Sequence, residues 1–281
     1  MSGDDHVANA FLSTHPAAAA RLLESMDADQ ASAVIQCVPA ETAARVLGLM
    51  LPTSSADCAE RLEAQAVAEL LEHLPSLSGA ILLRHFSRDA RDAVFERVSP
   101  ARMAALKLLL RYPLRAVGAW MEPRVLTLPD DCSVREAKAR LERANIGSPR
   151  IYVLDRDRRL RGAVRASVLL RSFGRNSIGT ILEPSDSIWA RESIASAQER
   201  DIWEKESEAP VINRQNEFVG AVAYADLRRG HRQLMRSESN DMANREVGEI
   251  AELLLIGFED AWQSLGEFVG PAQTGHTRKL R

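Results

Sequence analysis

Several side chains in this sequence could do chemistry, and their spacing tests each possibility. His73 and His85 lie twelve residues apart, and two imidazoles on equivalent positions of neighbouring repeats could hold a transition metal. No third ligand type recurs at that spacing, so we predict a solvated ridge. Glu204, Glu206 and Glu208 form an acidic cluster near an expected helix end, and we expect these carboxylates to face solvent.

No grouping of residues indicates catalysis. The sequence contains no Ser-His-Asp or Cys-His arrangement, glycine-rich phosphate loop or paired carboxylates in a recognisable context, so we predict that the protein is not an enzyme. Residues 156–165 and 228–236 are rich in arginine, and such basic segments could bind nucleic acid. Because no aromatic residues are interleaved there, we predict a solvated or domain-facing surface and no nucleic-acid partner.

Composition points to the cytoplasm. Cys37, Cys58 and Cys132 show neither a zinc spacing nor a disulfide framework, which is typical of a reducing compartment. No stretch reaches the ~18 apolar residues of a spanning helix, and the acidic N-terminus has no features of a secretion signal. We therefore expect a cytoplasmic protein that does not span a membrane.

The first hundred residues repeat with a period of twelve. The apolar pairs that carry this period are Leu22-Leu23, Val34-Ile35, Val46-Leu47, Leu70-Leu71, Leu82-Leu83 and Val94-Phe95. Twelve residues correspond to about nine of helix and about three of turn. Short helices cannot each bury an apolar face alone, so they stack into a superhelix. The sequence predicts an all-α superhelical repeat domain over residues 14–111, preceded by a flexible N-terminus over residues 1–13.

Residues 112–236 contain two copies of one β-α-β-β-α unit. The segment Trp120-Met121-Glu122-Pro123 returns as Ile181-Leu182-Glu183-Pro184, and the glycines Gly162 and Gly220 follow equivalent short apolar runs. We place the units at about 115–174 and 175–236. Each unit is too small for a good core of its own, so the two should pack as an intramolecular pair.

These motifs resemble a CBS domain. The run Gly220-Ala-Val-Ala-Tyr-Ala-Asp226-Leu227 is similar to the CBS exit motif, and the run from Gly162 to Leu169 fits it except at the acidic position. A twelve-residue helical repeat, a Tyr112-Pro113 junction and a CBS pair together resemble the cytosolic half of MgtE-type magnesium channels, over roughly residues 14–235. In that family a connecting helix and five membrane helices follow, and this sequence contains no such membrane helices.

The resemblance implies magnesium between the helical domain and the CBS pair, where the family places carboxylates. Here Tyr112-Pro113 is followed by Leu114-Arg115, and basic residues follow the second exit motif. Residues 1–110 carry 9 Lys/Arg against 14 Asp/Glu, whereas residues 111–236 carry 23 against 17. An acidic helical domain and a basic CBS pair attract each other, so they would close without a metal.

The resemblance also implies adenine-nucleotide binding in the CBS cleft. Asp226 matches the position that holds the ribose hydroxyls, whereas its Ser/Thr partner position is Ala223. The equivalent positions of the first unit are Arg165 and Val168. One site could survive, with Asp226 on the ribose and arginines such as Arg165 on phosphate. The alternative is that Asp226 only flanks a helix start. ATP or AMP and Mg²⁺ are thus the candidate ligands.

A C-terminal helix is predicted over residues 240–269. Its apolar residues follow helical spacing and form a wide stripe that includes Leu254, Phe258, Trp262 and Leu265, so we expect these four residues to contact a partner. Residues 270–281 should be disordered.

The multidomain fold therefore consists of an all-α superhelical repeat domain, an α/β CBS-domain pair and a C-terminal helix. The first interpretation is a soluble, non-catalytic regulatory or scaffold protein. It would form a homodimer through its CBS domains and contact a protein partner through the C-terminal helix. The alternative is a sensor of Mg²⁺ or an adenine nucleotide.

Overall fold

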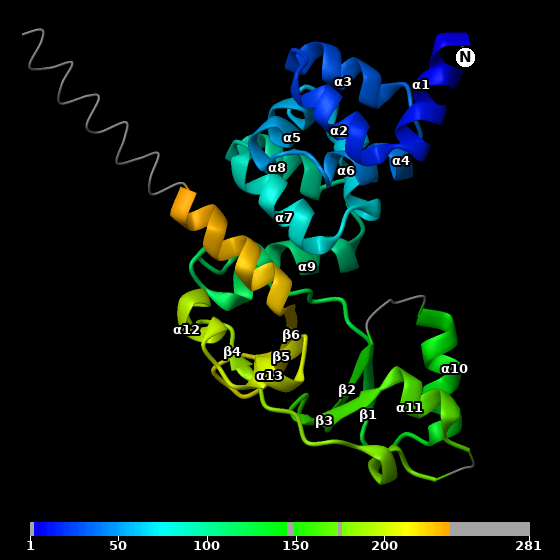
Figure 1. Ribbon diagram of the computed structural model, residues 1–281, viewed down its shortest axis with the longest axis vertical. Coiled ribbons are helices and arrows are strands. Elements are labelled where there is room, and N and C mark those ends of the chain that lie inside the picture. Colours follow the sequence, from blue (N-terminus) through cyan, green and yellow to red (C-terminus); the bar gives the residue numbers. More distant parts are fainter. Residues whose placement is uncertain (1–2, 145–148, 174–175, 237–281) are drawn as a thin grey trace, which may run out of the picture. The chain divides into compact units, whose positions relative to one another are not determined.

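The computed structural model describes residues 3–144, 149–173 and 176–236. Its first part consists of helices only (Figure 1). Their bounds are α1 Gly3–Thr14, α2 Pro16–Glu24, α3 Ala28–Gln36, α4 Ala40–Leu47, α5 Pro52–Ala59, α6 Ala64–His73, α7 Ser76–His85, α8 Arg88–Phe95 and α9 Pro100–Leu110. Helices α2 to α9 begin at residues 16, 28, 40, 52, 64, 76, 88 and 100. Each start follows the previous one by twelve residues, which confirms the period seen in the sequence.

The helices of this array pack two apart along the chain. Helix α4 contacts α2 and α6, and α7 contacts α5 and α9. The helix starts repeat because the residues before them stop one helix and cap the next. The side chains of Asp27, Ser87 and Ser99 each accept a hydrogen bond from a backbone N–H of the following helix, which satisfies a donor that the helix itself cannot pair.

Helix α1 differs from the sequence-based prediction. We expected a flexible N-terminus over residues 1–13, whereas the structure describes a helix at Gly3–Thr14 that contacts α2 and α4. The side chain of Leu12 is only 4% exposed. Ala10-Phe11 stands twelve residues before Leu22-Leu23, and the sequence-based prediction did not use this weak continuation of the period.

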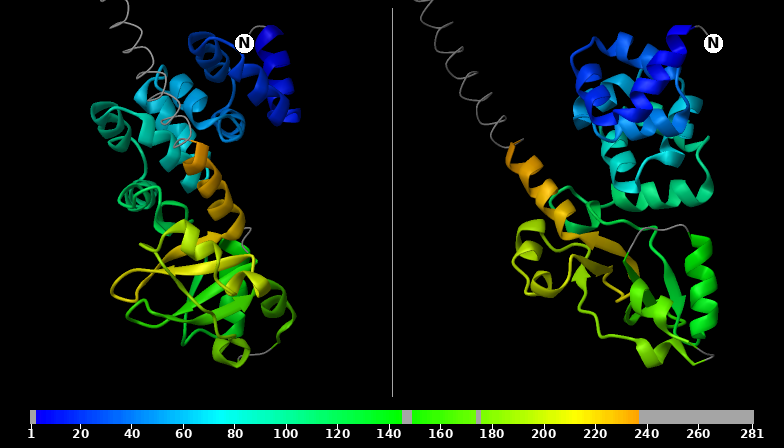
Figure 2. Two further views of the ribbon diagram at one scale, coloured as in Figure 1. Left: turned by 60° about the vertical axis from the view of Figure 1, so that its left-hand side comes forward. Right: turned by 45° about the vertical axis from the view of Figure 1, so that its right-hand side comes forward.

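The second part contains two three-stranded sheets (Figure 2). The first unit contains β1 Thr127–Pro129, α10 Val134–Ala144, β2 Arg150–Leu154, β3 Leu160–Arg165 and α11 Ala166–Arg171. The second contains β4 Ile188–Trp189, α12 Ile194–Gln198, α13 Ile202–Lys205, β5 Glu208–Ile212, β6 Phe218–Ala223 and a helix at 224–236. Single turns of 3-10 helix, η1 Val117–Ala119 and η2 Ile178–Ile181, precede β1 and β4.

The two sheets have the same topology and register. The central strand of each is parallel to the strand before it and antiparallel to the strand after it. Gly162 is opposite Val153 in the first sheet, and Gly220 is opposite Val211 in the second. The tandem repeat predicted from the sequence is therefore confirmed strand by strand.

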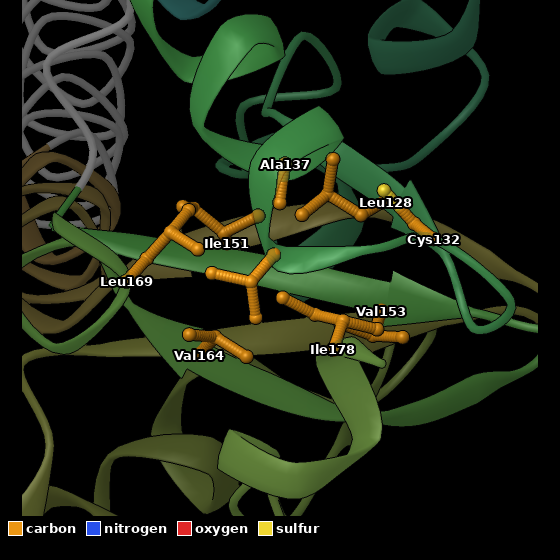
Figure 3. Close-up of a cluster of buried hydrophobic side chains, with 9 residues drawn as sticks. Leu128, Cys132, Ala137, Ile151, Val153, Val164, Leu169 and Ile178 are labelled. Carbon is orange, nitrogen blue, oxygen red and sulfur yellow. The ribbon is translucent and has the colours of Figure 1, made fainter. Parts of the chain in front are cut away.

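Side chains of β2 alternate between two cores, as expected for a strand buried on both faces. Ile151 and Val153 join a cluster with residues of α10, α11 and η2 (Figure 3). Tyr152 points the other way and packs on Phe218 of the second unit, with ring centroids 5.1 Å apart. The second core joins the units into one pair.

No helix in the described part of the chain is long and apolar enough to cross a membrane. The predicted C-terminal helix at 240–269 and the predicted disordered tail at 270–281 lie outside the described residues.

Candidate functional site

The two CBS units exchange backbone hydrogen bonds at two equivalent places. Ala163 in β3 and Glu183, before the first strand of the second unit, donate to each other's carbonyl oxygens at 2.9 Å. Ala221 in β6 pairs in the same way with Glu122, at 2.6 and 3.0 Å. The segment that enters each unit therefore lies against the exit strand of the other.

A glycine beside each pairing permits this close approach. A Cβ atom on Gly162 would lie 2.5 Å from the carbonyl oxygen of Glu183, and one on Gly220 would lie 2.7 Å from that of Glu122. Gly162 also has a φ of +155°, which side-chain-bearing residues rarely adopt. The glycines of the two exit motifs therefore have a steric role at this interface.

Arginine side chains of the first unit form ion pairs with glutamate side chains of the second unit. The Arg165 guanidinium, at the end of β3, lies 3.4 Å from the Glu183 carboxylate and 3.9 Å from that of Glu206. Arg150 also forms an ion pair with Glu206, and its side chain is only 5% exposed. The two arginines of the first unit thus find their counter-charges in the second unit.

Tyr152 makes a second polar link between the units. Its hydroxyl donates a hydrogen bond of 2.8 Å to the Glu208 carboxylate. Burial raises the pKa of Tyr152 well above its ordinary value, and the charge of Glu208 raises it further, so the hydroxyl stays protonated and can donate. The expectation that Glu206 and Glu208 face solvent was wrong, because both carboxylates bind side chains of the other CBS unit.

In the second unit, Asp226 lies among other carboxylates. It lies in the first turn of the helix at 224–236, as expected if it flanks a helix start. The pKa of Asp226 is raised, first by burial and then by the charges of Glu122 and Glu208, whereas Arg229 opposes the shift. Ala223, at the end of β6, offers no polar side chain to a ligand.

The residues predicted for one nucleotide site lie in separate surroundings. Arg165 interacts with Glu183 and Glu206, whereas the charges that act on Asp226 are those of Arg229 and two other carboxylates. The structure places Arg165 and Ala223 at equivalent ends of β3 and β6. Arg229 is the base whose charge acts on the pKa of Asp226.

The described residues include no group of three or more His, Cys, Asp or Glu side chains arranged to hold a metal ion. Glu122, Glu208 and Asp226 share an electrostatic environment, but they do not form such a group. His73 and His85 are both exposed at the ends of their helices, which agrees with a solvated ridge.

Sequence reasoning missed Arg150, the buried cation between the two units. One signal was present, because Arg150 directly precedes the apolar run Ile151–Leu154 and thus lies in a buried strand, where an arginine needs a partner. The predicted partner-binding residues, Leu254, Phe258, Trp262 and Leu265, lie outside the described residues.

Comparison with known proteins supports the same division of the chain. Residues 14–115 match the model of the MgtE intracellular N domain, and residues 117–175 match that of the CBS domain. No curated protein matches. A solved cytosolic domain of the Mg²⁺ channel MgtE, in complex with ATP, is 22% identical, with a TM-score of 0.69 over 76% of this chain and 89% of its own.

The soluble part of a magnesium transporter is 15% identical, with a TM-score of 0.57 over 83% of this chain and 97% of its own. At these identities the likeness establishes the fold, and the matched domain models establish the order of the domains. The chain is therefore an MgtE intracellular N domain followed by a CBS-domain pair, the domain order of the cytosolic region of MgtE-type magnesium channels.

Proposed function

We propose that this chain is a non-catalytic, cytoplasmic regulatory protein that acts through protein–protein contacts. The observation that carries the proposal is the cross-unit network of Arg150, Arg165, Glu183 and Glu206. A CBS pair that opens and closes around a ligand needs unsatisfied groups in its cleft. In this half of the pair the charges already bind each other, so the pair acts as a stable platform.

The platform forms a homodimer in this proposal. Leu170 and Phe173, at the end of the first CBS unit, are 54% and 86% exposed, which is unusual for large apolar side chains so close together. We expect light scattering after size exclusion to give twice the chain mass of 31.0 kDa. A double Leu170→Ser/Phe173→Ser variant should be a monomer.

Leu49 and Leu51 of the helical array provide the matched control, because they are 54% and 55% exposed. A double Leu49→Ser/Leu51→Ser variant should remain dimeric. A wild-type chain that is monomeric at micromolar concentration would overturn dimerisation through the CBS pair. The protein partner is expected on Leu254, Phe258, Trp262 and Leu265. Replacing these four residues by serine should abolish partner capture and leave the dimer intact.

A second candidate function is ligand sensing at the second CBS unit. The observation that favours it is the raised pKa of Asp226, which burial and the charges of Glu122 and Glu208 cause against the opposing charge of Arg229. A carboxylate in these surroundings would accept hydrogen bonds from ribose hydroxyls or attract a cation. A solved cytosolic domain with a similar fold is a complex with ATP. Sensing of an adenine nucleotide or Mg²⁺ would thus use the surroundings of Asp226 in the second unit.

Titration calorimetry with ATP, AMP and MgCl₂ separates the two functions. A sensor should bind at least one of them, and Asp226→Asn should weaken that binding, whereas Asp186→Asn, at an exposed aspartate, should not. Absence of heat and of any melting shift at millimolar ligand would exclude sensing and leave the scaffold function.

A further inference from the structure

A concave site lies at the opposite end of the second sheet from Asp226. It is a cavity of about 320 Å³ lined by residues that include Trp189, Arg191, Arg214, Arg111 and Tyr112, and we call it the Trp189 pocket. This volume suits a small organic ligand. The pocket goes beyond the proposed function, because neither the scaffold nor the sensing proposal uses it.

Strand direction separates the pocket from the CBS cleft. Strands β4 and β5 are parallel, so their carboxyl ends, at Trp189 and Ile212, meet at one edge of the sheet. Strand β6 runs antiparallel, with Phe218 opposite Ile212 and Ala223 opposite Glu208. Asp226 follows the far end of β6, so a ligand in the Trp189 pocket does not reach it.

The junction that completes the pocket is anchored to the second sheet. A Cβ atom on Gly118 would lie 2.6 Å from the Tyr112 ring, so this ring packs directly on the Gly118 backbone. The Gly118 N–H donates to the carbonyl of Ala190 at 2.8 Å. The carbonyl of Tyr112 accepts a hydrogen bond of 2.8 Å from Arg84. These contacts hold Tyr112 beside the end of β4.

The pocket has positive charge without a local counter-charge. Arg111, Arg191 and Arg214 are exposed, and no ion pair joins them to a carboxylate in the described part of the chain. The adjacent Glu192 carboxylate instead accepts two hydrogen bonds from Arg200, at 2.9 and 2.7 Å. Glu217, after the turn, accepts from the Asn213 amide at 2.7 Å.

The first CBS unit shows that this arrangement is not a property of the fold. The register places Leu128 and Ile188 at equivalent positions. The residues equivalent to Trp189, Arg191 and Arg214 are therefore Pro129, Asp131 and Arg156. Asp131 and Arg156 lie 4.0 Å apart and form an ion pair. In the second unit an arginine replaces this aspartate and a tryptophan replaces the proline.

Trp189 adds a flat apolar surface to this charge. Its side chain is 43% exposed, although most tryptophan side chains are largely buried. Arginines bind phosphate groups with two parallel hydrogen bonds, and an exposed indole ring stacks on other planar rings. We propose that the Trp189 pocket binds a phosphorylated ligand with a planar ring, of the nucleoside phosphate class, with its phosphates on the arginines.

Two probes test the phosphate contacts and the ring contact separately. Inorganic tripolyphosphate supplies the charge alone, and ATP supplies the charge and a ring. Titration calorimetry with the full chain should show that both bind and that ATP binds more tightly. Arg191→Gln/Arg214→Gln should weaken both probes by at least about tenfold, because charged hydrogen bonds are lost. Trp189→Leu should weaken only ATP, by about fivefold or more, because stacking is lost.

Arg156→Gln, at the equivalent turn of the first unit, is the matched control and should leave both affinities unchanged. These side chains are exposed, so circular dichroism should show that every variant is folded. The proposal is overturned if neither probe binds at millimolar concentration, or if the double arginine variant binds both as the wild type does. ATP binding that is lost in Asp226→Asn but kept in Trp189→Leu would assign the nucleotide to the CBS cleft instead.

Discussion

Replacing Arg150 by Met tests whether the buried ion pair holds the two CBS units together. Met has a similar length and removes only the charge and the hydrogen-bond donors. The Arg150 and Glu206 side chains are 5% and 24% exposed. The variant leaves Glu206 largely buried, with only Arg165 at 3.9 Å as a described counter-charge.

Breaking a buried pair by removing one partner costs about 3–5 kcal/mol. Because Glu206 is partly exposed and retains Arg165, we expect a smaller loss, about 2–3 kcal/mol of unfolding free energy. The matched control is Arg156→Met, whose ion pair with Asp131 has exposures of 93% and 68%. An exposed pair contributes about 0–1 kcal/mol, so the control should unfold almost as the wild type does.

Urea unfolding followed by tryptophan fluorescence measures this effect. Trp120, Trp189 and Trp203 lie in the CBS pair, and the helical array contains no tryptophan. In a Trp262→Phe background the signal therefore reports on the CBS pair alone. With a slope of about 2 kcal/mol per molar urea, the Arg150→Met midpoint should fall by about 1 M.

A double variant distinguishes the loss of stability caused by the unpaired Glu206 carboxylate from other effects of replacing Arg150. Neutralising the orphaned carboxylate in Arg150→Met/Glu206→Gln should recover more than half of the loss, because an unpaired buried charge is more costly than its absence. The reasoning is refuted if Arg150→Met is no less stable than Arg156→Met. It is also refuted if the double variant recovers nothing.

Three further predictions follow from single sites. Gly118→Ala should destabilise the CBS pair by about 2 kcal/mol in urea, because its new Cβ atom would lie 2.6 Å from the Tyr112 ring and overpacking is costly; a loss below about 0.5 kcal/mol would contradict this packing. The pKa of Asp226 is raised from 3.8, so the stability linked to this carboxyl is present below pH 3.8 and is lost as pH rises through the raised value. Asp226→Asn should accordingly melt higher than the wild type at pH 7 and no higher at pH 3, and a difference that does not change with pH would exclude this linkage. Titration of the folded protein with a disulfide reagent at pH 8 should modify Cys37, which is exposed, and spare Cys58, which is buried with a pKa raised to about 11; rapid reaction of Cys58 would show that α5 opens.

Much of the fold was predictable from periodic features. The helix starts follow the twelve-residue period because prolines and capping side chains such as Asp27 and Ser99 recur with it. The second CBS copy was predictable because Gly162 and Gly220 occupy the same register in their sheets. Helix α1 was not predicted in this way, because its pair Ala10-Phe11 is only a weak form of the apolar pair of the repeat.

The candidate site was only partly predictable. The exit motif identified Asp226, and the same motif showed that Ala223 occupies the Ser/Thr partner position. The partners of Glu206 and Glu208 come from the other unit, 41 to 56 residues away along the chain. Because period and motif report on neighbours along one element, they could not distinguish these carboxylates from solvent-facing ones.

The sequence by itself determined the modules, their order and their opposite charges, because periodicity and composition are local properties of the chain. Only the tertiary structure decided which charges find partners. It paired Arg150 and Arg165 with glutamates across the two units, and it placed Arg191 and Arg214 beside Trp189 at the edge where two parallel strands end. The physical reason is that an ion pair or a pocket depends on distances in space, which strand pairing and unit packing set.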